Sequence, residues 1–373
     1  MKKNNVRRKI RNIMILNVVL IVVLAVVAGL YFKNKNKADL NGDAKLSDRS
    51  AGDTLPDSGG NPDDIGESGE YSQDDDTTGE DAGGELTETQ ELALYSDLPY
   101  FVEDYTERYV EYKKRNPDLP YDKVITYVNI GLDYDFYENV SIIENCNDIT
   151  VLVNKYNKLP DDFEPELVQV DQSLCAPGVA PQYLREEAYK AFVKMHDDAK
   201  QLGLNITAYG TYRSIQTQHW IWNNAVNSGR TVEDVDSLNA RGGHSEHHTG
   251  LAIDVIKNNY SVEETEEFKW YRENAHKYGF IIRYPKGKEH ITGYKYEPWH
   301  LRYVGVPHAE IMYRNDLCLE EYIESLKVGV FYEANGYIIS RQSGESLKIP
   351  QNMKSVRVSP DNTGCYIITA EKP

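Results

Sequence analysis

The residues best able to do chemistry lie in one stretch, 241–255, which holds three histidines and three glycines. Its glycine-lined loop runs into an apolar segment, 251–256, in which Asp254 is the only charged residue. On a strand, alternate residues share a face, so Asp254 points away from Ile253 and Val255. A carboxylate in such a run must be paired or metal-bound, because burying it alone is costly. His247, at the preceding loop, is its natural partner.

A second motif, Tyr296-Glu297-Pro298-Trp299-His300-Leu301-Arg302-Tyr303, supplies the third group that a metal would need. Two imidazoles and one carboxylate, from His247, His300 and Asp254, leave the fourth position of a zinc ion open for water, as in catalytic sites. Such an ion lowers the pKa of water and polarises a carbonyl group. The pattern therefore predicts one catalytic Zn²⁺ per chain.

Glu297 is the candidate general base, which would later return the proton to a leaving amine. On a regular strand, Glu297 and His300 would face opposite ways. Pro298 lies between them and cannot donate a ladder hydrogen bond, so a bulge or kink is expected there.

A binding group for a carboxylate is predicted at Arg213, in a turn between a predicted strand and a predicted helix. Its guanidinium offers a bidentate fork, and backbone amides at a helix start also favour anions. Ser245 and Gln218 are secondary candidates for polar contacts with a substrate.

Structural alternatives exist for each of these groups. Asp254 could be a capping or salt-bridge residue, and Arg213 a surface ion pair. His244 and His248 flank His247, and the spacing favours His247 as the ligand. The remaining histidines considered are interpreted as structural or surface residues: His196, His219, His276 and His308. The chain has no S-x-x-K, H-E-x-x-H or G-x-S-x-G motif, which argues against three competing hydrolase chemistries.

The elements that must position these residues indicate an α+β fold, a small antiparallel sheet with flanking helices that carries the zinc site. Apolar residues at steps of three and four predict an amphipathic helix over 182–202. Helices are also expected over 215–227 and from a capping box at Ser261 and Glu264 to residue 278. Strands are expected at 205–209, 251–256, 280–284 and 294–303.

Composition divides the chain into parts of different character. An apolar run of twenty residues, Ile13–Phe32, is long enough to cross a bilayer and follows six basic residues, which favours an uncleaved anchor with a cytoplasmic N-terminus. The next segment holds 17 acidic and 2 basic residues and is expected to be a disordered spacer. The predicted parts are a basic tail and transmembrane anchor (1–37), the acidic linker (38–91), a helical N-terminal subregion (92–149), the zinc-dependent catalytic domain (150–327) and a small β appendage (328–373).

The overall charge and the cysteines limit the function further. The formal net charge of −18 argues against nucleic acid as a partner, since that binding needs clustered positive charge. Cys146, Cys175, Cys318 and Cys365 are too widely spaced for a zinc site. Outside the membrane they could form up to two disulfides, or they could be free buried thiols.

Together these motifs resemble the VanY-type D-alanyl-D-alanine carboxypeptidases of the M15 zinc peptidases, which share their metal-site fold with lysostaphin-type enzymes and the hedgehog signalling domain. The family pattern S-x-H-x-x-G-x-A-x-D matches Ser245 to Asp254, and E-x-W-H matches Glu297 to His300. The Y-R-S-x-x-x-Q element matches Tyr212 to Gln218. The similarity covers about residues 150–306.

The resemblance implies that His247, Asp254 and His300 bind zinc and that Glu297 is the catalytic base. It implies that Arg213, with Ser245 and Gln218, holds the carboxylate of a peptidoglycan stem peptide, from which the terminal D-alanine is removed. The anchor would place the enzyme outside the membrane of a bacterium, of the Gram-positive type.

Several alternatives stay open at this point. Relatives in the same family are L,D-carboxypeptidases or endopeptidases, and the motifs do not separate them. A non-catalytic wall-binding ectodomain is a different class of function, but such proteins are expected to lose a ligand or the base, and all four positions are filled. A metal-dependent signalling ligand of the hedgehog type is a further alternative, but the N-terminal membrane anchor and the carboxylate-binding Arg213 argue against it. The sequence leaves open the oligomeric state and whether the role is antibiotic resistance or routine wall trimming.

Overall fold

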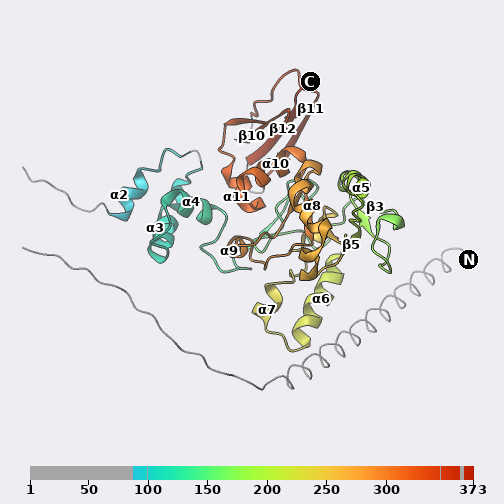
Figure 1. Ribbon diagram of the computed structural model, residues 1–373. Helices are drawn as coiled ribbons and strands as arrows, with labels where there is room; N and C mark the ends of the chain where they lie inside the picture. Colours follow the sequence, from blue (N-terminus) through green and yellow to red (C-terminus); the bar gives the residue numbers. More distant parts are fainter. Residues whose placement is uncertain (1–86, 99, 345, 362–364) are drawn as a thin grey trace, which may run out of the picture. The chain divides into compact units, whose positions relative to one another are not determined.

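A four-stranded sheet lies at the centre of the region predicted to be catalytic (Figure 1). The computed structural model describes residues 87–98, 100–344, 346–361 and 365–373, all of which belong to one compact unit, Asp81–Pro373. The strand order is β5-β6-β8-β7, and every neighbouring pair is antiparallel, as predicted. The strands are β5 (Ala208–Gly210), β6 (Ala252–Val255), β7 (Phe280–Ile282) and β8 (His300–Tyr303).

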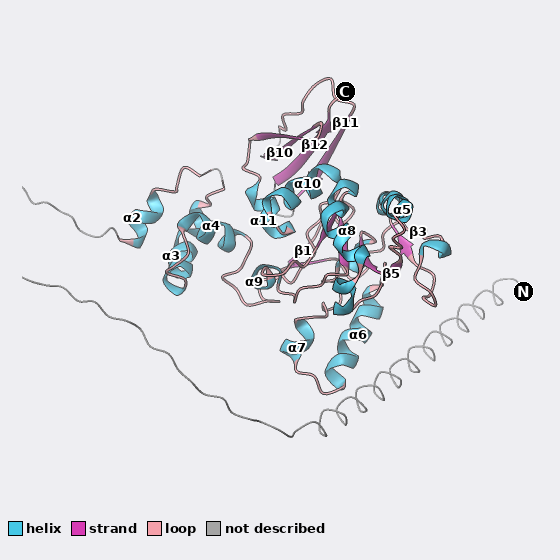
Figure 2. Cartoon of the chain, viewed as in Figure 1, coloured by secondary structure: helices cyan, strands magenta, loops and turns pink. Residues whose placement is uncertain are grey.

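Helices and short strands precede, separate and follow the strands of this sheet in the sequence (Figure 2). In the described ranges, no helix is both long and apolar enough to cross a membrane. The predicted anchor, 13–32, lies outside the described residues. The α-helices are α2 (Glu88–Ala93), α3 (Thr106–Arg115), α4 (Tyr121–Asn129), α5 (Glu186–Gln201), α6 (Ile215–Asn227), α7 (Val232–Asp236), α8 (Glu266–Asn274), α9 (Glu289–Thr292), α10 (Val306–Asn315) and α11 (Leu319–Ser325).

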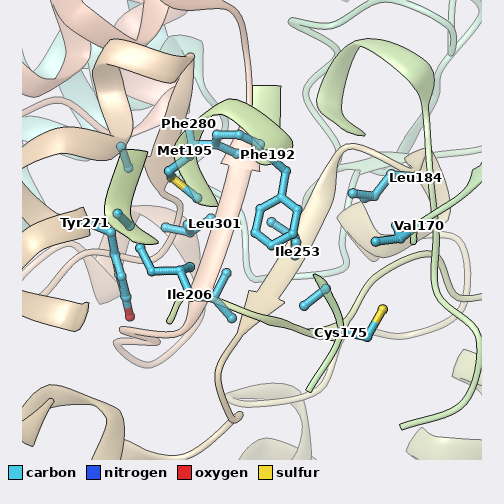
Figure 3. Packing of buried hydrophobic residues seen from close by; sticks show 14 of the residues in the cluster. Val170, Cys175, Leu184, Phe192, Met195, Ile206, Ile253, Tyr271, Phe280 and Leu301 are labelled. Carbon is cyan, nitrogen blue, oxygen red and sulfur yellow. The ribbon is translucent and has the colours of Figure 1, made fainter. Parts of the chain in front are cut away.

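The main hydrophobic core lies between the sheet and α5. Phe192 and Met195 of α5 belong to the same buried cluster as Ile253 of β6 and Leu301 of β8 (Figure 3). Because side chains alternate along a strand, burying Ile253 here turns Asp254 to the opposite face of the sheet. The core therefore fixes the orientation of the predicted metal ligand.

Truncation of Phe192 to alanine is expected to lower the free energy of unfolding by about 3–5 kcal/mol, because Phe192 is fully buried and its removal leaves a cavity. Urea denaturation followed by circular dichroism measures this. Phe331→Ala is the matched control, because Phe331 is 43% exposed, and it should cost less than half as much. Equal losses for the two variants would contradict this description of the core.

Several predicted boundaries are wrong. The helix predicted over 182–202 begins only at Glu186, after the short strand β4 (Tyr183–Leu184), and the strand predicted at 205–209 begins only at Ala208. The strand predicted at 280–284 ends at Ile282. The third helix begins at Glu266, where the Thr265 side chain accepts a hydrogen bond from the Phe268 amide, and residues 260–264 form a 3₁₀ turn instead of the predicted capping box. The predicted strand 294–303 is present only from His300 onward, because Pro298 and Trp299 form a turn. The cap that forms is thus Thr265 rather than Ser261, and a proline turn delays the start of the last strand.

The subregion predicted to be helical over 92–149 contains α3 and α4, but residues 131–149 form turns and the short strand β1 (Ser141–Ile142). Its helices also begin earlier than expected. Residues 88–91, the end of the predicted linker, lie in α2. Leu92 of α2 packs with Tyr109 of α3 and Val124 of α4 in a separate hydrophobic cluster. The subregion contacts α11 through Asn129, whose Nδ2 donates to Glu324 Oε2 at 3.3 Å.

The C-terminal residues form a second antiparallel sheet in the order β11-β12-β10-β9. A hairpin joins β9 and β10, with Asn335 and Gly336 at φ 48° and 80° in its turn. Ile339 and Ile367 of this sheet share a buried cluster with Met312 of α10, so the sheet packs against a helix of the catalytic region. Its strands are β9 (Phe331–Ala334), β10 (Tyr337–Ser343), β11 (Ser355–Pro360) and β12 (Cys365–Glu371).

Three of the cysteines are free, buried thiols, namely Cys146, Cys175 and Cys318. Of the two possibilities left open by the sequence, free thiols are therefore correct for these three.

Candidate active site

The three predicted metal ligands meet on one face of the central sheet. His247 lies in a 3₁₀ turn, Glu246–Thr249, that leads into β6, whereas Asp254 lies on β6 and His300 begins β8. Asp254 and His300 are direct cross-strand partners. Such partners point to the same side of an antiparallel pair, which explains why residues 46 positions apart in the chain converge.

The distances between the ligand atoms fit one small cation. Asp254 Oδ1 lies 3.5 Å from His247 Nε2 and 3.3 Å from His300 Nδ1. Ligand atoms at zinc distances and tetrahedral angles from one ion would be separated by about 3.3–3.5 Å. Asp254 Oδ1 is buried and has no hydrogen-bond partner among the described residues, so a bound cation would satisfy it.

Each imidazole is held by a contact that leaves one nitrogen for the ion. His247 Nδ1 lies 2.7 Å from the Thr211 carbonyl oxygen, which can only accept, so Nδ1 carries the proton and Nε2 is free to bind metal. In His300, Nδ1 faces Asp254, and Nε2 lies 3.7 Å from Glu246 Oε2. The two histidines would thus use different ring nitrogens.

The electrostatics of the site also favour a cation. Burial alone would lower the pKa of His300, but Asp254 and Glu246 outweigh it and raise the pKa to about 9. Burial opposes ionisation of Asp254, yet His247 and His300 hold the pKa of this carboxyl well below its usual value. The pocket therefore binds positive charge, which fits Zn²⁺ as well as a proton.

Glu297 lies next to the metal ligands, just before β8. The turn at Pro298 and Trp299 ends with the His300 amide donating to the Glu297 carbonyl at 3.2 Å, and this kink places Glu297 Oε2 3.7 Å from His300 Nδ1. The predicted kink is thus a turn. Burial, reinforced by the charge of Asp254, raises the pKa of Glu297 to about 8, so this group binds a proton more tightly than an ordinary glutamate does.

Arg213 reaches the same site from the segment after β5. Its backbone amide donates to the His247 carbonyl at 3.1 Å, and its Nη1 donates to Gln218 Oε1 at 2.7 Å. Gln218 Nε2 in turn donates to the Ala240 carbonyl at 2.7 Å. Both ends of the Gln218 amide are therefore occupied, and its contacts orient Arg213.

The polar neighbours of His247 are held within the loop. Ser245 Oγ accepts from the His247 amide at 3.3 Å, which leaves its own proton to donate. His244 Nδ1 contacts the Asn154 carbonyl at 2.8 Å, and His248 Nδ1 contacts the Arg213 carbonyl at 2.6 Å. The expectation that His247 is the ligand, and that the two flanking histidines are not, agrees with these contacts.

All seven predicted site residues line one cavity of about 360 Å³. Several other residues of its wall were not predicted from the sequence. These include Asn258, Asn259, Tyr260, Tyr284 and Tyr294.

A buried charge cluster behind the metal ligands was also missed. Glu246 Oε1 accepts from Arg283 Nε at 2.8 Å and from Arg302 Nη1 at 2.6 Å, and Arg283 forms a bidentate pair with Glu320 at 2.7 and 2.9 Å. Both arginines and Glu246 are completely buried. Two positive and two negative groups balance, so the cluster holds Glu246 Oε2 toward His300 without net charge. The sequence gives one hint of this cluster, because Glu246 directly precedes His247 and Arg302 follows His300 by two residues.

Glu246→Gln is expected to weaken zinc binding by about 10- to 100-fold, because the variant loses the anion that faces His300 Nε2. Competition titration with a chromogenic chelator measures this. Glu320→Gln removes the same charge from the same cluster without facing a metal ligand, and it should keep zinc affinity within about threefold. A zinc affinity that falls equally in both variants would assign the effect to the cluster's stability.

Comparison with known proteins agrees with this geometry. The family model described as VanY, D-alanyl-D-alanine carboxypeptidase, matches residues 181–306. The chain is 42% identical over 198 residues to the putative carboxypeptidase YodJ of Bacillus subtilis (strain 168), covering 51% of this chain and 72% of that protein. It is 34% identical to a D-alanyl-D-alanine carboxypeptidase of Enterococcus faecium, covering 50% of this chain and 61% of the relative.

Among solved structures, the chain is similar to the vancomycin-resistance D,D-dipeptidase VanXYg in complex with a D-Ala-D-Ala phosphinate analogue, with a TM-score of 0.53, 28% identity and coverage of 61% of this chain and 96% of the other. A VanB-type VanY variant in complex with Zn(II) has a TM-score of 0.40, 32% identity and coverage of 47% and 98%. The LdcB L,D-carboxypeptidase has a TM-score of 0.47, 42% identity and coverage of 50% and 91%. With the motifs, the match to the family model and the YodJ similarity in agreement, the chain belongs to the VanY family of D-alanyl-D-alanine carboxypeptidases.

Proposed function

We propose that this chain is a zinc-dependent D-alanyl-D-alanine carboxypeptidase that removes the terminal D-alanine from peptidoglycan stem peptides. One observation carries the proposal: three residues able to hold zinc, the Glu297 carboxylate with its raised pKa and the Arg213 guanidinium all line the same cavity. The family membership and the D-Ala-D-Ala carboxypeptidase activity named for the Enterococcus faecium relative support it.

In this reaction the chain's own residues bind the substrate and move one proton. Arg213 holds the terminal carboxylate with the nitrogens that Gln218 leaves free, and Ser245 Oγ donates a further hydrogen bond. This grip would place the last peptide bond beside Glu297 and the metal ligands.

Zinc, held by His247, Asp254 and His300, would polarise the scissile carbonyl and make water more acidic. Glu297 takes a proton from the attacking water while the water oxygen bonds to the carbonyl carbon. The C–N bond then breaks as Glu297 returns that proton to the amine of the leaving D-alanine. The products are the shortened peptide, as a carboxylate, and free D-alanine.

The test is a comparison of the purified full-length chain with pentapeptides ending in D-Ala-D-Ala and with tetrapeptides, with and without a chelator. We expect D-alanine release from the pentapeptide, lost with the chelator and restored by zinc. Cleavage of the tetrapeptide alone would indicate the L,D-carboxypeptidase activity, which needs the same clamp, base and metal. Absence of any release would leave the non-catalytic wall-binding function as the better account.

We also propose that the enzyme acts outside the membrane and is held there by the anchor at 13–32. The support is the apolar character of that run, interrupted only by Asn17, and the basic residues before it. Retention of the full-length chain in the membrane fraction after alkaline carbonate extraction is the expected result, and its release into the supernatant would contradict the anchor.

A further inference from the structure

A tyrosine hydroxyl in the active-site cavity has no assigned partner. Tyr284 lines the cavity and is only 5% exposed. No described residue forms a hydrogen bond with its hydroxyl, and the hydroxyl oxygen keeps some exposure in a side chain that lines the cavity. The hydroxyl of a largely buried tyrosine usually finds a partner. An open one beside a reaction centre is a donor available to a ligand.

Three other polar side chains of the same cavity are already occupied. Gln218 is bonded to Arg213 and to a backbone carbonyl. The hydroxyl of Tyr294 lies 3.4 Å from that of Tyr137. Arg230 forms an ion pair at 2.8 Å. Tyr284 therefore differs from these neighbours in having its donor unused.

The Tyr284 ring is held in place on several sides. Its centroid lies 4.9 Å from that of His300 and 4.8 Å from that of Tyr294, and the guanidinium carbon of Arg283 lies 5.1 Å from it. The Tyr284 carbonyl accepts from the Glu297 amide at 3.0 Å, which ties its backbone to that of the proposed base. A donor fixed in this way needs no reorganisation when charge develops nearby.

The hydroxyl also carries a proton to donate, because an ordinary phenol has a pKa of about 10 and stays neutral at physiological pH. During water addition the scissile carbonyl oxygen gains negative charge, and it is this atom that a neutral, fixed O–H group would stabilise.

We infer that Tyr284 donates a hydrogen bond to the scissile carbonyl oxygen as that oxygen gains negative charge, and is thus a further catalytic residue. The inference rests on the proposed function. It predicts that Tyr284 stabilises the transition state more than the bound substrate, which separates it from a residue that only shapes the pocket.

The test uses Tyr284→Phe in the full-length, zinc-loaded enzyme. We expect kcat for the pentapeptide to fall about 10²- to 10³-fold, KM to stay within about threefold, and zinc content to remain at one per chain. A D-Ala-D-Ala phosphinate, which mimics the tetrahedral state, should bind more weakly by a similar factor in calorimetry. D-Ala-D-Ala itself should bind with an affinity within about threefold of that of the wild type.

Tyr137→Phe is the matched control, since it removes a hydroxyl that is already bonded to Tyr294, and it should leave kcat within about threefold. An active wild type together with an unimpaired Tyr284→Phe, or with unchanged phosphinate affinity in that variant, overturns this inference alone. A wild type that hydrolyses neither peptide overturns the proposed function, and the role of Tyr284 with it.

Discussion

Glu297→Gln is expected to lower kcat for the pentapeptide by about 10³-fold while leaving one zinc per chain. The substitution keeps the shape of the side chain but removes the group that takes the proton from water. Glu297 is not one of the three proposed ligands, and its Oε2 lies 3.7 Å from His300 Nδ1. Metal analysis and steady-state kinetics on the same preparation measure both quantities.

The matched control is Glu263→Gln. Glu263 accepts a hydrogen bond from Tyr296, which directly precedes Glu297, but it lies outside the catalytic cavity and is exposed. We expect this variant to keep kcat within about threefold. Substantial activity in Glu297→Gln with zinc present would assign the base to another residue, whereas loss of zinc from that variant would make Glu297 a ligand.

Arg213→Ala is expected to lower kcat/KM by about 10²- to 10³-fold for peptides with a free carboxylate. Removing one partner of a hydrogen-bonded charge pair in a shielded site costs about 2–5 kcal/mol, and each tenfold change in rate corresponds to about 1.4 kcal/mol. Desolvation disfavours the charge of Arg213 and lowers its pKa, although Asp254 and Glu297 partly compensate. A bound substrate carboxylate would supply the missing counter-ion.

The assay that isolates the clamp uses a peptide with an amidated C-terminus. If Arg213 recognises the carboxylate, wild type and Arg213→Ala should differ by less than about threefold on the amide. Arg230→Ala is the control variant, because Arg230 is paired with Asp234 in a solvent-exposed ion pair and such pairs contribute little. An equal loss on acid and amide would mean that Arg213 shapes the site rather than binding the carboxylate.

The metal site could be predicted from the sequence because its constraints are local. The spacing from His247 to Asp254 joins a loop to a strand, and the alternation of that strand decides where the carboxylate points. Placing His300 beside Asp254 required only that their two strands be neighbours, and β6 and β8 do pair with Asp254 opposite His300. The helix expected over 215–227 is present as α6, and the strands of the central sheet lie where the sequence placed them, although their ends differ.

The parts that were missed depend on contacts distant in sequence. Arg283 and Glu246 are 37 residues apart, and Arg302 and Glu246 are 56 apart, so no local pattern indicates that they share a buried cluster. The dual contact of Gln218 is hidden for the same reason. Tyr284 lies in the bend after β7, in a segment with no chemical signature, and only its packing against His300 in the folded chain places it at the site.

The two terminal regions carry less functional information. The N-terminal helices and the C-terminal sheet both contact α11, through Glu324, which accepts from Asn129 Nδ2 and from Arg341 Nη2. One short helix therefore joins both regions to the catalytic part. Their contribution to specificity, and the domain boundaries inferred from composition, stay predictions.

Crystals of the zinc-loaded protein, with data recorded on both sides of the zinc absorption edge, test the central claim most directly. The account predicts one anomalous peak per chain, about 2.0–2.2 Å from His247 Nε2, Asp254 Oδ1 and His300 Nδ1. A zinc ion bound elsewhere, with these three atoms left uncoordinated, would contradict it.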